Sequence, residues 1–373
     1  MVHCLNSIGR SLVMTVFGES HGEVVGVVLD GCPAGLPLSL EDVQREVDKR
    51  RPISELSTLR AEVDKVEFKS GVFRGRTTGA PLCMIVRNLD VDPAVYEEFK
   101  FKPRPSHADY PAFIRYGGFN DYRGGGMFSG RMTVAYVMAG AVAKKLLSMI
   151  GIQVYAHTVQ IGHVKLEREV SLEELKTKVY TSRVRCVDQE VSKEMEQVIL
   201  EVAAKSDSIG GVVEGLAFNV PVGLGDPLFG SLDGDIAQLL FNIPAVKAVE
   251  FGAGVRAAYM MGSEFNDQYV YRNGRVETIT NNSGGILGGL SNGMPIVVRV
   301  TFKPTPSIPK RQKTVDLIRK EDTYIEIKGR HDPCIVPRAV PIVEACLAFV
   351  IADHCLTLGL IPKVFENALR ENV

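Results

Sequence analysis

The sequence predicts an α+β fold in a single domain that is built from two related halves. Three observations lead to this prediction: an internal repeat, several long apolar segments typical of helices, and short alternating runs typical of antiparallel strands. The chain has 373 residues of which 45% are hydrophobic, enough to form one large core. No linker rich in Pro, Gly or Ser divides it, so we treat residues 1–373 as one domain.

The repeat appears when the sequence is shifted by 188 positions against itself. Residues 20–36 (SHGEVVGVVLDGCPAGL) then align without a gap with residues 208–224 (SIGGVVEGLAFNVPVGL), and seven of seventeen positions are identical. Each copy predicts a loop, a strand and a Pro-x-Gly-Leu turn that leads into a helix, which gives repeat units near 20–50 and 208–243. Two copies of one unit favour halves that pack together around a pseudo-twofold axis.

The remaining elements follow from capping signals and periodicity. Ser39 is placed to cap a helix in which Leu40, Val43 and Val47 share one face. The other expected elements are helices over 132–151, 192–205 and 338–358, a strand over 294–302, and a hairpin over 268–279 that turns at Asn273-Gly274.

Composition limits the class of partner and the compartment. The chain has 43 Lys and Arg residues against 44 Asp and Glu, which argues against a nucleic-acid-binding protein, so local basic clusters must bind any anion. The seven scattered cysteines contain no Cys-x-x-Cys pair and predict reduced thiols. There is no apolar leader and no run of eighteen uncharged apolar residues, so we expect a cytoplasmic protein without a membrane span.

A histidine in the first repeat copy is the first candidate for catalysis. The stretch GESHGE, residues 18–23, places His21 beside Ser20 and between two carboxylates, where an imidazole could move a proton at neutral pH. The alternative is a polar turn between strands. The second copy has Ile209 at the position of His21, so the scaffold does not require a histidine there.

Two further loops hold polar residues that bear on binding. In RPSHADY, residues 104–110, the spacing of His107 and Asp109 suits a metal-ligand pair, but also a surface loop with a turn-forming aspartate. In YRGGGMFSGR, residues 122–131, three glycines, Ser129 and Arg131 precede a helix. Free backbone N–H groups and the helix dipole make this an anion site, which we favour over a tight turn that only needs positive φ.

Three basic segments add to this picture. KPTPSIPKRQ (303–312) is a proline-stiffened loop that could hold a phosphate, and GRHDP (329–333) combines a cation, a histidine and a carboxylate. DKRRP (48–52) ends a helix with three cations. Each has a structural alternative: a solvated loop, capping of the next helix by Asp332, and pairing with the helix dipole. Together they favour a phosphorylated metabolite as the ligand.

Five of these stretches together resemble the chorismate synthase family, in order and across nearly the whole chain: GESHGEVVGVVLDGCPAG, YRGGGMFSGR, GGILGGLSNGMPI, KPTPSIP and GRHDPCIVPRAVPIVEA. The resemblance implies a carbon–oxygen lyase of the shikimate pathway of aromatic amino acid biosynthesis. Its reaction would be 1,4-anti elimination of phosphate from 5-enolpyruvylshikimate 3-phosphate to give chorismate, with reduced FMN and no net redox change. It also implies a single β/α/β sandwich with antiparallel sheets, assembled as a homotetramer.

The same resemblance implies a role for each matching residue. His21 would be the acid near the departing phosphate, His107 would lie near the flavin pyrimidine ring, and Asp332 would help to remove the C6 proton through the flavin. Ser20 and Ser129 would support these proton transfers. The substrate anions would be held by Arg50, Arg51, Arg60 and Arg131. The flavin would contact Met127, Phe128, Ser129, Ala245, Gly288, Lys303, Pro304, Thr305, Pro306, Ser307 and Arg330.

The sequence departs from the family pattern at three places. Met127 and Phe128 stand where many relatives are more polar, so only backbone contacts carry over there. Pro244 replaces a common asparagine and removes a side-chain hydrogen bond. The segment PISELSTLR, 52–60, lacks the Gly and Arg often found after the Arg-Arg-Pro motif, which puts one substrate or reductant contact in doubt.

Two rival functions stay open at the level of sequence. One is a metal-dependent phosphohydrolase that uses His21, His107, Asp109 and Asp332. The other is a non-catalytic flavin-binding protein on the same scaffold. The sequence also leaves open whether NADPH or an external flavin reductase would reduce the flavin.

Overall fold

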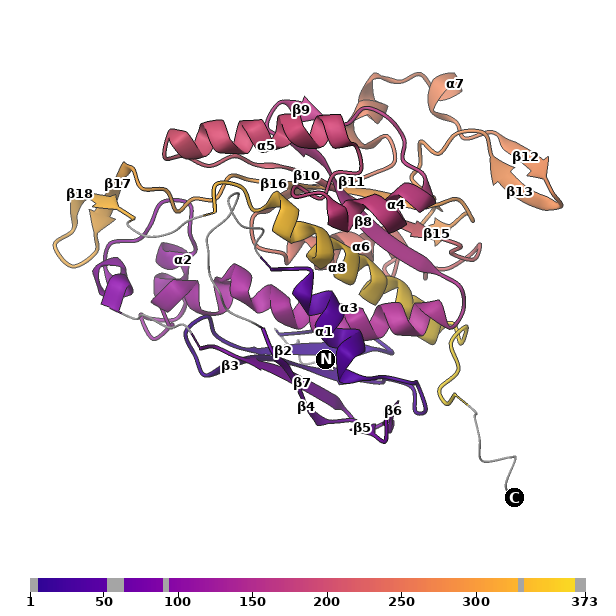
Figure 1. Ribbon diagram of the computed structural model, residues 1–373, viewed down its shortest axis with the longest axis horizontal. Helices are drawn as coiled ribbons and strands as arrows, with labels where there is room; N and C mark the ends of the chain where they lie inside the picture. Colours follow the sequence, from indigo (N-terminus) through magenta and orange to yellow (C-terminus); the bar gives the residue numbers. More distant parts are fainter. Residues whose placement is uncertain (1–5, 52–63, 90–93, 328–331, 366–373) are drawn as a thin grey trace.

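The computed structural model describes residues 6–51, 64–89, 94–327 and 332–365. Two five-stranded antiparallel sheets lie on opposite sides of the molecule, and helices α3 (Thr133–Ser148) and α8 (Val336–Thr357) run between them (Figure 1). The mixture of helices and antiparallel sheets agrees with the predicted α+β class.

The first sheet comes from the N-terminal part of the chain and has the order β1-β2-β3-β7-β4. Its strands are β1 (Ser7–Ile8), β2 (Val13–Gly18), β3 (Val24–Asp30), β7 (Leu82–Arg87) and β4 (Val66–Ser70). Val25, Val27 and Leu29 alternate along β3 and are fully buried, as expected when one face of a sheet packs on a core.

The second sheet has the order β11-β16-β10-β8-β9. Its strands are β11 (Val246–Phe251), β16 (Ile296–Phe302), β10 (Gly211–Phe218), β8 (Gln153–Ile161) and β9 (Val164–Lys165). The predicted strand over 294–302 is confirmed as β16, whose even-numbered residues from Ile296 to Phe302 are buried.

The two copies of the sequence repeat occupy matching places. The aligned strands are β3 and β10, and each is the middle strand of its five-stranded sheet. Each is followed by a serine-capped helix, α1 (Leu40–Asp48) after β3 and α6 (Leu232–Phe241) after β10. A symmetry axis that relates the halves stays a prediction.

The predicted helices form within a few residues of their expected bounds. Ser39 makes a full capping box on α1, and Val43 and Val47 are buried, as the pattern predicted. Gly140 of α3 lies against Ala345 of α8, where an added Cβ would be 2.3 Å from the Ala345 Cβ. This glycine therefore allows α3 and α8 to approach closely. The other helices are α2 (Asp109–Arg115), α4 (Leu172–Lys178), α5 (Gln189–Ala204) and α7 (Gly262–Phe265).

Helix α8 is also, by length and composition alone, apolar enough to cross a membrane. It is the only such helix in the part of the chain that the structure describes, and 94% of the apolar window is buried inside the molecule. Its position between the two sheets accounts for its composition, since a helix buried on all sides is apolar all round.

Several two-stranded hairpins complete the fold. The predicted turn at Asn273-Gly274 is confirmed, with φ of 50° and 76° at these two residues, as a tight hairpin turn requires. The hairpin strands are β12 (Tyr269–Arg272) with β13 (Arg275–Thr278), β5 (Val72–Phe73) with β6 (Arg76–Thr77), β14 (Ile286–Leu287) with β15 (Leu290–Ser291), and β17 (Arg311–Asp316) with β18 (Glu321–Glu326).

Candidate active site

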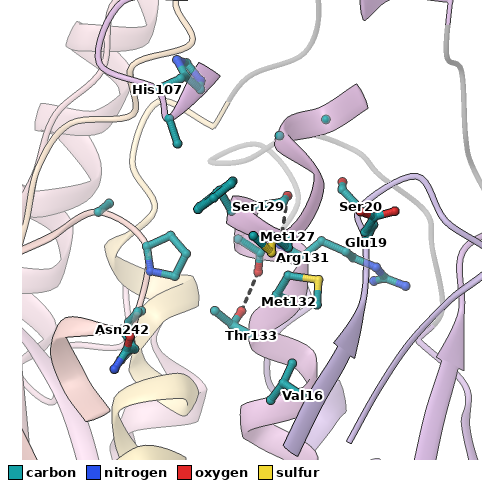
Figure 2. Close-up of a pocket in the computed structure, with 18 of the residues that line it drawn as sticks. Val16, Glu19, Ser20, His107, Met127, Ser129, Arg131, Met132, Thr133 and Asn242 are labelled. Carbon is teal, nitrogen blue, oxygen red and sulfur yellow. Dashed lines mark hydrogen bonds between the residues drawn. The ribbon is translucent and has the colours of Figure 1, made fainter. Parts of the chain in front are cut away.

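A cavity of about 1910 Å³ opens where the N-termini of α3 and α8 meet loops from both halves of the chain. Figure 2 shows His107 on one side of it, with Ser20 and Arg131 on the other. Most of the predicted site residues line it: Ser20, His21, Arg50, Arg51, His107, Met127, Phe128, Ser129, Arg131, Ala245, Lys303, Thr305, Pro306, Ser307 and Asp332.

Four predicted residues are not among those that line it. Arg60 and Arg330 lie outside the described residues. Pro304 sits in the chain between two lining residues but does not itself line the cavity. Gly288 lies in the turn between β14 and β15 and is also absent from the lining.

The glycine loop packs directly against the loop that carries His21. Gly124, Gly125 and Gly126 all have positive φ, and a Cβ on Gly124 would lie 2.4 Å from the His21 ring. The carbonyl of Gly126 accepts a hydrogen bond from the Ser20 amide at 3.2 Å. All three glycines therefore suit the backbone conformation, and Gly124 and Gly126 also allow close approach, whether or not the loop binds an anion.

His21 is buried at the edge of the cavity, with 8% of its surface exposed. Its Nδ1 lies 3.3 Å from the Ser20 hydroxyl, and its ring meets the Tyr96 ring edge-on with 4.8 Å between centroids. The loop thus holds the imidazole in one orientation at the cavity wall, as a proton-transfer role requires.

His107 connects its own loop with the loop of Ser307, which is 200 residues away in the sequence. Its Nδ1 is 3.0 Å from the Pro105 carbonyl oxygen, which only accepts, so Nδ1 carries the hydrogen. Its Nε2, 2.9 Å from the Ser307 hydroxyl, is then free to accept. Burial, helped by the charge of Arg104, lowers the pKa of His107 to about 4. The imidazole is therefore neutral near pH 7.

Arg104 and Asp109 form a buried ion pair beside His107. The guanidinium Nε and Nη2 each donate to a carboxylate oxygen of Asp109 at 2.8 Å, and the Arg104 amide donates to the same group. Both oxygens of Asp109 are thus committed to Arg104. Sequence reasoning missed Arg104, although it belongs to the same RPSHADY stretch.

A second buried cluster joins Arg50 and Arg131 through Asp64. Arg50 donates from Nη1 to Asp64 at 3.0 Å and from Nη2 to the Thr133 hydroxyl at 3.1 Å. Arg131 donates to the other carboxylate oxygen of Asp64, and its Nε donates to Asn88 at 2.8 Å. Arg51 is more exposed and pairs with Asp48 at 2.7 Å. Sequence reasoning missed Asp64, which comes two residues before β4.

Asp332 pairs with a cation of the following helix. Its Oδ2 accepts from Arg338 Nη1 at 2.5 Å, and its side chain is 10% exposed. The N-cap of α8 is Ile335, which makes no side-chain cap hydrogen bond. The structural alternative, in which Asp332 caps this helix, is therefore wrong.

The loop that follows β16 brings a hydroxyl and a cation to the cavity. The Thr305 hydroxyl lines the cavity, is buried and has no hydrogen-bond partner among the described residues. Lys303 donates from Nζ to the Ser106 carbonyl at 2.7 Å, and its amide donates to the Ala245 carbonyl at 2.9 Å. Ala245 itself has a φ of 76°, a strained conformation typical of functional sites.

Cations outnumber carboxylates in the described lining of the cavity. The Arg and Lys side chains are Arg50, Arg51, Arg104, Arg115, Arg131, Lys303 and Arg338, and the carboxylates are Glu19, Asp64, Asp109, Asp121 and Asp332. The excess of positive charge favours ligands with several negative charges.

The comparison with known proteins decides the family. The sequence profile of chorismate synthase matches residues 12–356. The chain belongs to the chorismate synthase family. Chorismate synthase of Korarchaeum cryptofilum is 54% identical over 93% of this chain and 96% of its own length. That of Methanothermobacter thermautotrophicus is 52% identical over 96% of both chains. A crystal structure of chorismate synthase, 34% identical, superposes with a TM-score of 0.75 over 94% of this chain and 93% of its own.

Membership in the chorismate synthase family settles the class of function. The chain is a carbon–oxygen lyase of aromatic biosynthesis that acts on a small molecule. The resemblance stated from the five motifs is thereby confirmed, and neither rival function is supported.

Proposed function

We propose that the cavity binds reduced FMN and 5-enolpyruvylshikimate 3-phosphate together, and that the chain eliminates phosphate from this substrate to give chorismate. The observation that carries the proposal is the cavity itself, which combines an excess of cations with a volume of about 1910 Å³. A pocket for one drug-sized ligand measures roughly 300–1000 Å³. There is room for two anionic molecules side by side.

The residues at one side of the cavity fit a flavin phosphate and ring. Lys303 supplies a cation, and the Thr305 hydroxyl is a buried polar group that still needs a partner. Ala245 and the backbone of residues 127–129 supply further contacts, whereas the roles of Gly288, Pro304 and Arg330 rest on the resemblance alone. When bound there, reduced FMN would supply electron density to the breaking carbon–oxygen bond.

The other side of the cavity fits the substrate. Its phosphate and two carboxylates need several donors in a site with little water, and Arg50, Arg51 and Arg131 line that region. Arg60 belongs to the same proposal but lies outside the described residues. Arginines can hold such groups with two parallel hydrogen bonds, which fixes orientation as well as charge.

Three side chains handle protons. His21, next to Ser20, donates to the phosphate as it leaves. Asp332, held by Arg338, takes up the proton that leaves C6 of the substrate. Burial keeps the His107 imidazole neutral near pH 7. The negative charge of bound ligands raises the pKa of His107. Its Nε2 can then hold a proton between the ligand and Ser307. Ser129 supports these transfers at the start of α3.

The finer architecture belongs to the same proposal. A single β/α/β sandwich with pseudo-twofold halves is supported by the central position of both β3 and β10. The homotetramer and the need for NADPH or an external reductase rest on resemblance to the family. A cytoplasmic location is supported by the free cysteines of the described chain, five of which are buried.

An anaerobic assay tests the proposal. The chain is mixed with FMN and substrate, with dithionite or NADPH as reductant, and chorismate absorbance and phosphate release are followed together. We expect equal amounts of both products, only with reduced flavin and without inhibition by EDTA. Release of phosphate without chorismate, or only with a metal ion, would refute it. Activity with dithionite but not NADPH would assign flavin reduction to another protein.

A further inference from the structure

Asp64 is the only carboxylate in the described cavity lining that contacts two of the proposed substrate arginines. One oxygen accepts from Arg50 Nη1 at 3.0 Å, and the other accepts from Arg131 Nη1. The Asp64 side chain is 15% exposed, and those of Arg50 and Arg131 are 7% and 13% exposed. The three groups therefore form one largely dehydrated cluster in the cavity wall.

The backbone around Asp64 is held in place by a side chain of α1. Gln44 donates from Nε2 to the Asp64 carbonyl at 2.8 Å, and its Oε1 accepts from the Val66 amide at 2.9 Å. Gln44 lies in α1 and Arg50 comes directly after the C-cap of this helix, so the same helix holds the carboxylate and the guanidinium that it binds.

The two arginines are also restrained on their far sides. Thr133 accepts from Arg50 and donates to the Gly130 carbonyl at 2.6 Å, so its hydroxyl has a fixed direction. Arg131 donates to Asn88 from Nε and to the Arg87 carbonyl from Nη2. In Figure 2, Arg131 extends from the start of α3 toward the loop of Glu19 and Ser20. The Arg50 guanidinium has five N–H donors, and Asp64 and Thr133 accept from only two of them.

The Asp64 carboxylate reduces the repulsion between the positive charges of Arg50 and Arg131. The pKa of Arg50 is lowered to about 10, first of all by burial. The negative charge of Asp64 opposes this shift, and the positive charges of Arg338 on α8 and of Arg131 add to it. The Nε of Arg50 is buried without a hydrogen-bond partner among the described residues. Without Asp64, two guanidiniums would face each other in a dehydrated site with no charge between them.

We propose that Asp64 is a positioning residue that holds Arg50 and Arg131 in one fixed orientation, so that together they present a preformed site for an anionic group of the substrate. This inference rests on the proposed function, because it takes the two arginines as substrate ligands. It adds a residue that touches neither substrate nor flavin but determines how tightly the substrate binds.

The test is the binding of 5-enolpyruvylshikimate 3-phosphate in the presence of oxidised FMN, measured by titration calorimetry from pH 7 to 9.5. Oxidised flavin prevents turnover, and the substrate phosphate is fully ionised across this range since its second pKa is about 6. For Asp64→Asn we expect Kd to rise about tenfold at pH 7, as expected when a charge-assisted contact is lost. Kd should also rise more steeply with pH than in the parent chain, because the negative charge of Asp64 raises the pKa of Arg50 and Asn lacks this charge.

Two other variants separate positioning from a general structural effect. Asp64→Glu keeps the negative charge but changes its distance from the arginines. Its Kd should therefore be higher than that of the parent chain, whereas the dependence of Kd on pH should be the same as in the parent chain. Asp235 is a matched control outside the cavity, since its carboxylate also bridges two basic groups, Arg10 at 2.8 Å and His354 at 2.9 Å. Asp235→Asn should leave Kd and its pH profile unchanged.

Other results would overturn the inference. Tighter binding by Asp64→Asn would show that Asp64 competes with the substrate, and unchanged Kd in both Asp64 variants would show that it does not position the arginines. If Asp64→Asn does not fold, unchanged Kd in Asp64→Glu alone overturns the proposal. Failure of the parent chain to form chorismate would instead count against the proposed function, because the binding experiment involves no turnover.

Discussion

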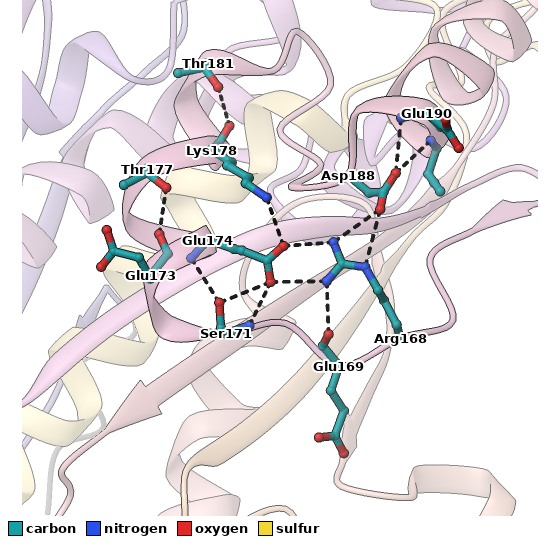
Figure 3. Close-up of polar contacts among 11 residues, drawn as sticks. Arg168, Glu169, Ser171, Glu173, Glu174, Thr177, Lys178, Thr181, Asp188 and Glu190 are labelled. Carbon is teal, nitrogen blue, oxygen red and sulfur yellow. Dashed lines mark hydrogen bonds and ion pairs between the residues drawn. The ribbon is translucent and has the colours of Figure 1, made fainter.

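The cavity and the network around Arg168 use the same types of side chain for different purposes. In the network, Arg168 lies between Glu174 and Asp188, with Arg168 Nη2 at 2.9 Å and 3.2 Å from their carboxylate oxygens (Figure 3). Arg168 is 42% exposed, and both acids also serve helix starts: Glu174 in the capping box of α4 and Asp188 as the N-cap of α5. Hydrogen bonds from Arg168 first of all hold the pKa of Glu174 far below its usual value.

The cavity differs in burial, in charge balance and in sequence separation. Arg50, Arg131 and Asp64 are mostly buried, and cations exceed carboxylates in the described lining. Arg168 and its partners lie within twenty residues of one another, whereas Arg131 and Asp64 are 67 residues apart and His107 and Ser307 are 200 apart. Locally balanced charge in water secures helix ends, whereas buried and unbalanced charge is suited to binding anions.

The largest expected effect on the cavity side of this comparison is that of His21→Ala. We expect kcat for phosphate release to fall by roughly 10²–10⁴, the range for loss of a general acid, with little change in KM. Anaerobic steady-state kinetics measure both constants. His163→Ala, an exposed histidine outside the cavity lining, is the control and should behave as the parent chain. A large rise in KM with normal kcat would contradict the acid role.

His107→Ala should come next. Turnover is expected to fall by about 10² or more, as for other groups that hold a proton in the site, while FMN still binds because Lys303 and Thr305 remain. Flavin binding is measured by fluorescence titration and turnover by chorismate absorbance. Normal turnover in this variant would remove His107 from the mechanism.

Arg131→Lys should weaken substrate binding about tenfold, since a lysine cannot serve Asp64, Asn88 and a ligand at once. The effect should appear in the Kd of the substrate with oxidised FMN and leave FMN affinity unchanged. An equal loss of FMN affinity would mean that the arginine cluster faces the flavin, which would reverse the proposed arrangement of the two ligands.

The burial of His107 in the cavity should make the stability of the native chain depend on pH. Its pKa of about 4 in the ligand-free chain lies below its usual 6.5, so between these values the unfolded chain takes up a proton that the native chain does not. Native stability should therefore fall as pH decreases through this window. In NMR titrations, the His107 pKa should rise when FMN and substrate bind. A pKa near 6.5 in the free chain would contradict the burial argument.

The smallest effect is expected in the network. Arg168→Ala should lower Tm by about 1–3 °C, because exposed ion pairs contribute little and the chain is large. The difference should shrink in high salt, and turnover should not change. Thermal unfolding at two salt concentrations measures this, and a loss of activity with Tm preserved would show that the two regions are coupled.

The sequence predicted those features that depend on neighbours in the chain. The cap at Ser39, the turn at Asn273-Gly274 and the presence of α3 and α8 follow from short-range patterns, and each is confirmed. The repeat also predicted β3 and β10, because seven of seventeen positions are identical in the two copies.

The details of the cavity could not be derived in the same way. Asp64 precedes an ordinary strand and gains its importance only where β4 passes Arg50 and Arg131. The neutral state of His107 depends on burial and on Arg104, which a reference pKa does not include. The resemblance to the family motifs predicted most of the residues that line the cavity. The residues that hold them in place were identified only from hydrogen bonds and ion pairs in the structure.

The most direct measurement is a crystal structure of the chain with oxidised FMN and 5-enolpyruvylshikimate 3-phosphate. The account predicts both molecules in the one cavity, with the flavin against Lys303 and Thr305 and the substrate phosphate or carboxylates on Arg50 and Arg131. A structure with either molecule bound elsewhere, or with the arginines turned away from the substrate, would contradict it.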